Sequence, residues 1–206
     1  MAIAFMIAAK QLHMTVYASL LAALTAAGAY LAIPIGPVPI ILQNLFIFLT
    51  GLLLGSKWGV ASVGVYLLAG ALGLPVFAGG VGGIGRFAGP TGGYLLGFLP
   101  AVYVIGWITE TTRKHAVFDI LAMVCGGIII YVFGVTWLKM LTGMTLAKTL
   151  AVGMYPFILG DALKIAAAVP IAKALRPVIY RDQVPGISSH ETEVMGRRSE
   201  EQKIGR

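Results

Sequence analysis

Charged residues are scarce in this chain, and their scarcity defines its class. Asp, Glu, Lys and Arg make up only 11% of its 206 residues, whereas 58% are hydrophobic and the mean hydropathy is +0.90. A soluble domain of this length cannot bury so much apolar surface, so lipid must be the solvent for most of it. The composition predicts an all-α integral membrane protein.

Residues that build metal sites and catalytic centres are also few. The single cysteine, Cys125, permits neither an internal disulfide nor a cysteine metal cluster, and the three histidines are never paired at helical spacing. Before the C-terminal tail the only acidic residues are Glu110, Asp119, Asp161 and Asp182, and no His or Ser is identifiably placed to form a catalytic dyad with Asp161. We expect no metal site, no bound cofactor and no enzyme activity.

The positive charge does not indicate a nucleic-acid partner. The formal net charge is +7, but most basic residues flank apolar segments, as in the cytoplasmic loops of membrane proteins. A secretory signal is not apparent, because the apolar stretch of "MAIAFMIAAK" precedes its first positive charge. We therefore expect a lipid bilayer around the chain and a first segment that is retained.

Six apolar stretches are long enough to cross, or nearly to cross, a bilayer. They are Met14–Ile33, Ile40–Leu54, Trp58–Leu74, Gly93–Ile108, Val117–Leu138 and Gly160–Leu175. The second and third are short and are joined through "GSKWG", which predicts a tight helical hairpin. We expect six transmembrane helices in a domain of residues 1–182, followed by a polar, disordered tail at 183–206.

The distribution of Lys and Arg predicts the orientation of these spans. The richer side holds Lys10, Lys57, Arg113, Lys114, Lys173, Arg176 and Arg181. The opposite loops hold Arg86, Lys139 and Lys148. Because positive loops stay inside, both termini are expected in the cytoplasm, which fits an even number of spans.

A glycine-rich loop joins the third and fourth spans on the outer side. It reads "LPVFAGGVGGIGRFAGPTGGY", with apolar residues between its glycines. Its G-x-G-x-x-G is no dinucleotide fingerprint, because no βαβ unit surrounds it, and no P-loop G-K-[ST] follows. Glycine lets a backbone approach a ligand closely, so we interpret the loop as a lid rather than a loose connection. The predicted lid residues are Gly79, Gly80, Gly82, Gly83, Gly89, Pro90, Thr91 and Gly92.

Asp161 and Lys164 lie near the head of the sixth apolar stretch, in "YPFILGDALKIAAAVPIAKAL". Their i,i+3 spacing puts both on one helix face, where they can pair or share a ligand. Charges at bilayer depth cost about 2.5–3.5 kcal/mol each and are functional by default. The alternative is that Asp161 caps the helix while Lys164 extends to the headgroups.

Three further residues are candidates for ligand binding. Gln43 precedes Asn44 at the head of the second span, where an amide can cap the helix or read a polar ligand. Tyr94 directly follows the glycine-rich loop and is the one aromatic residue here that we favour over an interface-belt role. Arg86 is the only cation in the loop and can bind a carboxylate or remain solvated.

Small residues recur every four positions in the first span. Ala18, Ala22 and Ala26 form one row, and Ala23 and Ala27 form a parallel row. Such spacing lets another helix approach closely in lipid. The partner helix can belong to this chain or to another subunit, and the spacing leaves both open.

Three stretches in this order resemble the BioY family, the membrane-embedded biotin-capture subunits of energy-coupling-factor vitamin transporters. They are "ALTAAGAYLAIPIGPVPIILQN", "GLPVFAGGVGGIGRFAGPTGGYLLGF" and "MYPFILGDALK". The resemblance implies six transmembrane helices in the bacterial inner (cytoplasmic) membrane, cytoplasmic termini, and a site near the extracellular surface under the loop between helices three and four. It also implies ligand contacts by Asp161 and Lys164.

The same resemblance implies partners beyond biotin. The alanine motif of the first helix would contact a transmembrane coupling subunit, and two ATPase subunits would hydrolyse ATP in place of this chain. The alternatives are capture of another small vitamin, and biotin transport without the coupling subunits. A self-sufficient ion-coupled transporter is disfavoured, because neither inverted repeats nor midplane acidic residues are visible.

Overall fold

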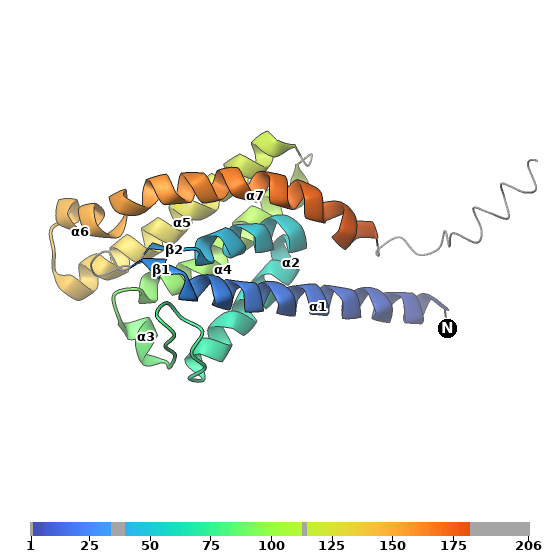
Figure 1. The fold of residues 1–206 in the computed structure, drawn as a ribbon, viewed down its shortest axis with the longest axis horizontal. Coiled ribbons are helices and arrows are strands. Elements are labelled where there is room, and N and C mark those ends of the chain that lie inside the picture. Colours follow the sequence, from blue (N-terminus) through green and yellow to red (C-terminus); the bar gives the residue numbers. More distant parts are fainter. Residues whose placement is uncertain (1, 34–39, 113–114, 182–206) are drawn as a thin grey trace, which may run out of the picture.

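Helices account for nearly all of the computed structural model, which describes residues 2–33, 40–112 and 115–181 (Figure 1). The helices are α1 (Ala2–Tyr30), α2 (Gln43–Ala71), α3 (Gly85–Ala88), α4 (Gly92–Thr111), α5 (Ala116–Thr142), α6 (Leu146–Gly153) and α7 (Tyr155–Arg181). The two-residue strands β1 (Ala32–Ile33) and β2 (Ile40–Ile41) pair antiparallel between α1 and α2. The all-α prediction is confirmed. Several predicted features lie outside the described residues: most of the "IPIGPVP" connection, Arg113, Lys114 and the tail at 183–206.

Four of the described helices are long and apolar enough to cross a membrane. They are Lys10–Tyr30 within α1, and the whole of α2, α4 and α5. The predicted fourth and fifth spans fall inside α4 and α5, and the predicted sixth lies within α7. The connection between the fifth and sixth spans, predicted as a loop, contains the short helix α6. The chain is a multi-span helical membrane protein, and the count of six spans stays a prediction.

The predicted second and third spans are the two halves of α2, separated by a kink at Gly55. Gly55 has φ 76° and ψ −170°, a positive-φ conformation that glycine adopts without strain. Figure 1 shows α2 bending back on itself. The Glu110 carboxylate caps the second half, accepting from the Ser56 backbone N–H at 2.9 Å and from the Ser56 hydroxyl at 2.7 Å. The predicted hairpin therefore turns where "GSKWG" begins.

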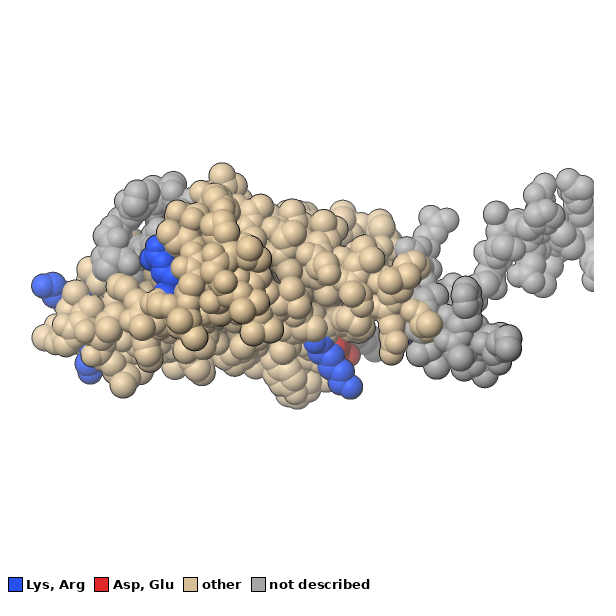
Figure 2. Space-filling model, turned by 90° about the horizontal axis from the view of Figure 1, so that it is seen from below, with Lys and Arg blue, Asp and Glu red and all other residues tan. Residues whose placement is uncertain are grey.

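Apolar side chains face outward as well as inward, as expected of a protein solvated by lipid. On α5, for example, Val117 and Ile128 are exposed, and Figure 2 shows charged side chains near the two ends of the molecule with an uncharged band between them. The interior is filled from α2, α4 and α5, and its largest fully buried apolar residues include Phe48, Leu52, Phe98, Ile105 and Met123. The distribution matches a helical bundle in a bilayer.

The two alanine rows of α1 face different surroundings. Ala18 and Ala22 are buried, and the Ser62 hydroxyl of α2 donates to the Ala18 carbonyl at 2.7 Å. Their row therefore packs inside the chain, which corrects the prediction that it contacts a partner. Ala26, in the same row, is half-buried, whereas Ala23 and Ala27 are exposed. Only the exposed row is available to another subunit.

A buried ion pair joins α5 to α7. The Arg176 guanidinium donates twice to Asp119, at 2.7 Å from Nη1 to Oδ2 and at 2.7 Å from Nη2 to Oδ1. Both side chains are at least 90% buried. Arg176 had been predicted as a loop charge that sets membrane orientation, but it is a structural residue because the bidentate pair neutralises it inside the protein.

The two ends of the described chain lie at the same end of the molecule. In Figure 1, the beginning of α1 and the end of α7 lie together, while α3, α6 and the β1–β2 pair lie at the opposite end. The glycine-rich loop therefore lies at the end opposite the termini.

Removing one partner of the Asp119–Arg176 pair should destabilise the bundle. In Asp119→Ala the arginine stays buried without its partner, so we expect a loss of about 3–5 kcal/mol and a clearly lower unfolding temperature of the detergent-purified protein. The double variant Asp119→Leu/Arg176→Met should recover most of the loss, and Lys173→Ala, at an exposed position of α7, should change little. An unaltered unfolding temperature in Asp119→Ala would contradict a structural role for the pair.

Candidate functional site

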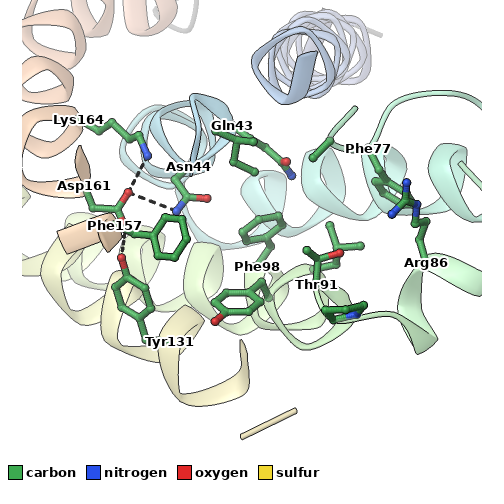
Figure 3. A pocket seen from close by; sticks show the side chains of 15 residues that line it. Gln43, Asn44, Phe77, Arg86, Thr91, Phe98, Tyr131, Phe157, Asp161 and Lys164 are labelled. Atoms are coloured by element: carbon green, nitrogen blue, oxygen red, sulfur yellow. Dashed lines mark hydrogen bonds and ion pairs between the residues drawn. The ribbon is translucent and has the colours of Figure 1, made fainter. Parts of the chain in front are cut away.

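A cavity of about 220 Å³ lies at the end of the molecule opposite the termini, between α2, α4, α5, α7 and the glycine-rich loop. Apolar and aromatic side chains form most of its wall, and polar side chains enter from separate elements (Figure 3). It is lined by Ile41, Gln43, Asn44, Phe77, Ala78, Arg86, Pro90, Thr91, Tyr94, Leu95, Phe98, Tyr131, Phe157, Asp161 and Lys164. All five predicted ligand-binding residues are among them.

The Asp161 carboxylate is the centre of the polar contacts. Its Oδ1 accepts from Lys164 Nζ at 2.7 Å and from Asn44 Nδ2 at 3.4 Å, and its Oδ2 accepts from the Tyr131 hydroxyl at 2.5 Å. Figure 3 shows these groups converging from α7, α2 and α5. Asp161 and Lys164 are 6% and 8% exposed, so the pair is held inside the protein rather than at the headgroups.

The alternative role of Asp161 as a helix cap is wrong. Helix α7 begins at Tyr155, six residues earlier, so Asp161 lies in the helix interior where backbone amides are already paired. Lys164 does not extend toward solvent, because its ammonium is bonded to Asp161. A buried ion pair stabilises a protein only when further partners satisfy its remaining lone pairs, and Tyr131 and Asn44 do this for the carboxylate.

Gln43 lies at the first position of α2 and is 1% exposed. Its Nε2 donates to the Tyr66 hydroxyl at 2.9 Å, and that hydroxyl donates to the Val76 carbonyl at 3.2 Å. Val76 belongs to the start of the glycine-rich loop, so a chain of two hydrogen bonds connects a cavity-lining amide to the loop backbone.

Tyr94 forms part of the cavity wall through its ring. Its hydroxyl donates to the Gly153 carbonyl at 2.6 Å, which connects α4 to the end of α6. The ring lies directly against Gly134 of α5, where an added Cβ would be 2.2 Å from Tyr94 Cδ1. The phenol oxygen is therefore engaged within the protein, and Tyr94 offers a ligand an apolar surface.

The glycine-rich loop is attached at both of its ends. The Tyr30 hydroxyl of α1 donates to the Pro75 carbonyl, Tyr66 holds Val76, and Trp137 Nε1 of α5 donates to the Gly89 carbonyl at 2.9 Å. The segment between the attachments folds back through a Phe77–Val81 bridge and then forms α3. The loop is therefore held at both ends, and its residues Phe77, Ala78, Arg86, Pro90 and Thr91 line one side of the cavity.

The predicted lid residues all lie in or beside this loop. Gly79, Gly80 and Gly83 have positive φ, and a Cβ at Gly82 or Gly92 would be 2.1 or 1.9 Å from a backbone oxygen. Glycine is thus required at these positions by backbone conformation or by space. Of the predicted lid residues, Pro90 and Thr91 line the cavity. The six glycines, Gly79, Gly80, Gly82, Gly83, Gly89 and Gly92, are not among its lining residues.

Arg86 approaches the cavity from α3, on the side away from Asp161 (Figure 3). It is half-buried, its backbone N–H donates to the Gly83 carbonyl at 3.1 Å, and its guanidinium makes no hydrogen bond or ion pair within the described residues. The two ends of the cavity therefore differ: Asp161 and Lys164 cancel in charge, whereas Arg86 carries an unbalanced positive charge. A ligand with a neutral polar group at one end and an anion at the other matches this distribution.

Sequence reasoning missed several cavity residues. Tyr131 lies in the apolar run "IIIYVFGV" and carries no local signal, because its contact depends on how α5 packs against α7. Phe157 was within reach, since it precedes Asp161 by four residues and therefore shares its helix face. Phe77 was one of the apolar residues expected to pack the loop down as a lid, Phe98 was not singled out, and both lie in the cavity wall.

Comparisons with known proteins extend over nearly the whole membrane part of the chain. A family model described as the BioY family matches residues 4–181. "Probable biotin transporter BioY" of Pyrococcus horikoshii is 42% identical over 158 residues, and "Biotin transporter BioY" of Thermotoga maritima is 42% identical over 159 residues; each alignment covers 77% of this chain and 93% of the relative.

A solved structure shares the fold. A crystal structure of "the S-component for biotin from an ECF-type ABC transporter" matches with a TM-score of 0.75 and 35% sequence identity. The match covers 81% of this chain and 92% of that chain.

The contact between Gly134 and Tyr94 predicts a sharp effect of one added methyl group. Gly134→Ala should displace the Tyr94 ring, costing about 1–3 kcal/mol of stability through overpacking and disturbing the cavity wall. Gly127→Ala, on the same helix, should be neutral or slightly stabilising, because the nearest atom to its Cβ would be 3.9 Å away. Thermal unfolding of both purified variants checks this, and equal unfolding temperatures would contradict the packing described for Tyr94.

Proposed function

The chain belongs to the BioY family, and on this premise we propose that it captures biotin at the cavity around Asp161 and delivers it for uptake across the bacterial cytoplasmic membrane. The family is one of transporters, so the chain acts in transport rather than catalysis. The observation that carries the proposal is the charge-balanced Asp161 cluster at one end of an apolar cavity, with Arg86 at the other. The alternative ligand is another small vitamin with the same distribution of polar groups.

The chemistry of biotin suits this cavity. Its ureido ring offers N–H donors beside a carbonyl acceptor, and Asp161 can accept from a donor while Lys164, Asn44 or Gln43 donates to the carbonyl. Its thioether ring and aliphatic chain require apolar walls, which the side chains of Phe77, Phe98 and Phe157 provide. The opposite arrangement, with the carboxylate on Lys164, is less favourable because that ammonium is already paired.

We assign the valerate carboxylate to Arg86. This guanidinium borders the cavity and has no acidic partner in the described part of the chain, so an arriving carboxylate supplies its first ion pair. Arg86 lies on α3, between the attachments of the glycine-rich loop at Val76 and Gly89. A carboxylate bound there would also hold the loop closed, which is the role of a lid on the extracellular side.

The remaining parts of the proposal concern the assembly. We propose six transmembrane helices with cytoplasmic termini, counting the two halves of α2 separately, in a membrane domain of residues 1–182 followed by a tail at 183–206. A transmembrane coupling subunit would dock on the exposed Ala23–Ala27 row of α1, and two ATPase subunits would hydrolyse ATP, since this chain would carry no cofactor. Transport by this chain without those subunits is the alternative.

Equilibrium binding of labelled biotin to the detergent-purified protein tests the function. Wild type should bind tightly, and Lys164→Ala should weaken binding about 10- to 100-fold, because a hydrogen bond to a charged group is lost. Lys173→Ala, at an exposed position on the same helix, is the matched control and should bind like wild type. A folded wild type that ignores biotin but binds another vitamin would support the alternative ligand instead.

The orientation of the ligand predicts a different pattern for Arg86. Arg86→Gln should weaken the binding of biotin about tenfold or more but leave the binding of biotinamide, which has no carboxylate, nearly unchanged. Lys148→Gln, an exposed cation at the same end of the molecule, is the control. Equal losses for biotin and biotinamide would contradict the contact between Arg86 and the carboxylate.

A further inference from the structure

Tyr131 stands out among the cavity residues because its hydroxyl is directed at the one carboxylate in the cavity. The phenol donates to Asp161 Oδ2 at 2.5 Å, and Tyr131 belongs to α5 whereas Asp161 belongs to α7. Resting on the proposed function, we infer that Tyr131 is a positioning residue: it orients the Asp161 carboxylate so that Oδ2 receives an N–H donor of the ligand.

The two oxygens of the Asp161 carboxylate differ in how many hydrogen bonds they already accept. Each ionised oxygen can accept about two hydrogen bonds. Oδ1 already accepts from Lys164 at 2.7 Å and from Asn44 at 3.4 Å, whereas among the described residues Oδ2 accepts from Tyr131 alone. Oδ2 is therefore the oxygen with capacity left for a ligand.

Without Tyr131 the orientation of the Asp161 carboxylate, and so of the free lone pair on Oδ2, would be poorly defined. The terminal torsion of an aspartate is broad and roughly two-fold, so the carboxylate can rotate about its Cβ–Cγ bond. Lys164 is a flexible cation on the same helix, and the Asn44 contact is long at 3.4 Å. The short bond from a separate helix is the contact that fixes the plane of the group. A ligand with a directed N–H then finds its acceptor already oriented.

Tyr94, the second tyrosine of the cavity, does not donate its hydroxyl to Asp161. The Tyr94 hydroxyl donates to a backbone carbonyl at Gly153, so it connects helices and leaves the polar cluster alone. Tyr131 instead donates its hydroxyl proton to Asp161, the carboxylate that we propose binds the ligand. Its effect on binding is therefore expected to act through Asp161.

A double-mutant cycle tests this dependence. Biotin affinity is measured for purified wild type, Tyr131→Phe, Asp161→Ala and the double variant. Tyr131→Phe keeps the ring and should bind biotin about tenfold more weakly, with an unfolding temperature near that of wild type. In the Asp161→Ala background the same substitution should change affinity less than about twofold, because nothing remains to be oriented. Tyr103→Phe, at an exposed position of α4, is the control and should have no effect.

Infrared spectroscopy of the ligand-free protein supplies a readout that does not depend on biotin. The carboxylate band that disappears in Asp161→Ala belongs to Asp161, and Tyr131→Phe should shift it while Tyr103→Phe should not. An unshifted band would overturn the inference, as would unchanged biotin affinity in Tyr131→Phe. Equal affinity losses in both backgrounds would also overturn it, since Tyr131 would then contact the ligand itself.

The two proposals fail in distinguishable ways. A folded wild type that binds no biotin would end the proposed function. The infrared band would still decide whether Tyr131 orients Asp161, a shifted band supporting the positioning role and an unshifted band removing it. If Asp161→Ala binds too weakly to complete the cycle, the Tyr131→Phe affinity and the same band decide the outcome.

Discussion

The need to provide partners for the Asp161 carboxylate governs the geometry of the cavity. A charge buried in apolar surroundings is tolerated only when it is paired and hydrogen-bonded, and Asp161 meets both conditions through Lys164, Asn44 and Tyr131. These partners come from three helices, so the carboxylate fixes the relative positions of α2, α5 and α7 at one point. The apolar walls then enclose the space beside that point, and the cavity inherits a neutral polar end.

Polar groups join helices at the other end of the molecule as well. Asp119 and Arg176 join α5 to α7, and Glu110 joins α4 to the kink of α2. Close packing of small residues also holds the helices together: a Cβ on Gly106 of α4 would be 2.3 Å from the backbone at Gly55. In lipid, where apolar contact alone gives little preference for one helix pairing, such close packing and a few polar pairs specify the arrangement.

Much of the fold was readable from the sequence because hydropathy and glycine act locally. The predicted span Gly93–Ile108 lies within α4, and the predicted turn at "GSKWG" coincides with the Gly55 kink. The i,i+3 spacing of Asp161 and Lys164 predicted a shared face, and the two form an ion pair at 2.7 Å. These features depend on a single helix or turn, so no knowledge of tertiary packing was required.

The parts that escaped prediction depend on which helices pack together. Tyr131 meets Asp161 across 30 positions of sequence, and Arg176 meets Asp119 across 57. The spacing of the alanines defines two rows on α1 but not which row faces Ser62, so Ala18 was predicted to meet a partner although it is buried. Periodicity describes one helix at a time, and these residues acquire their roles only from a second one.

The kink of α2 restricts which residues can stand at positions 55 and 110. Any side chain at position 55 would have to adopt a φ of 76° and would put its Cβ 2.1 Å from Glu110 Oε1. A shorter residue at position 110 would relieve that clash, but it would leave the Ser56 amide at the start of the second half-helix without its acceptor. Positions 55 and 110 are 55 residues apart in the chain, yet the turn needs both, glycine for its backbone conformation and Glu110 for its acceptor.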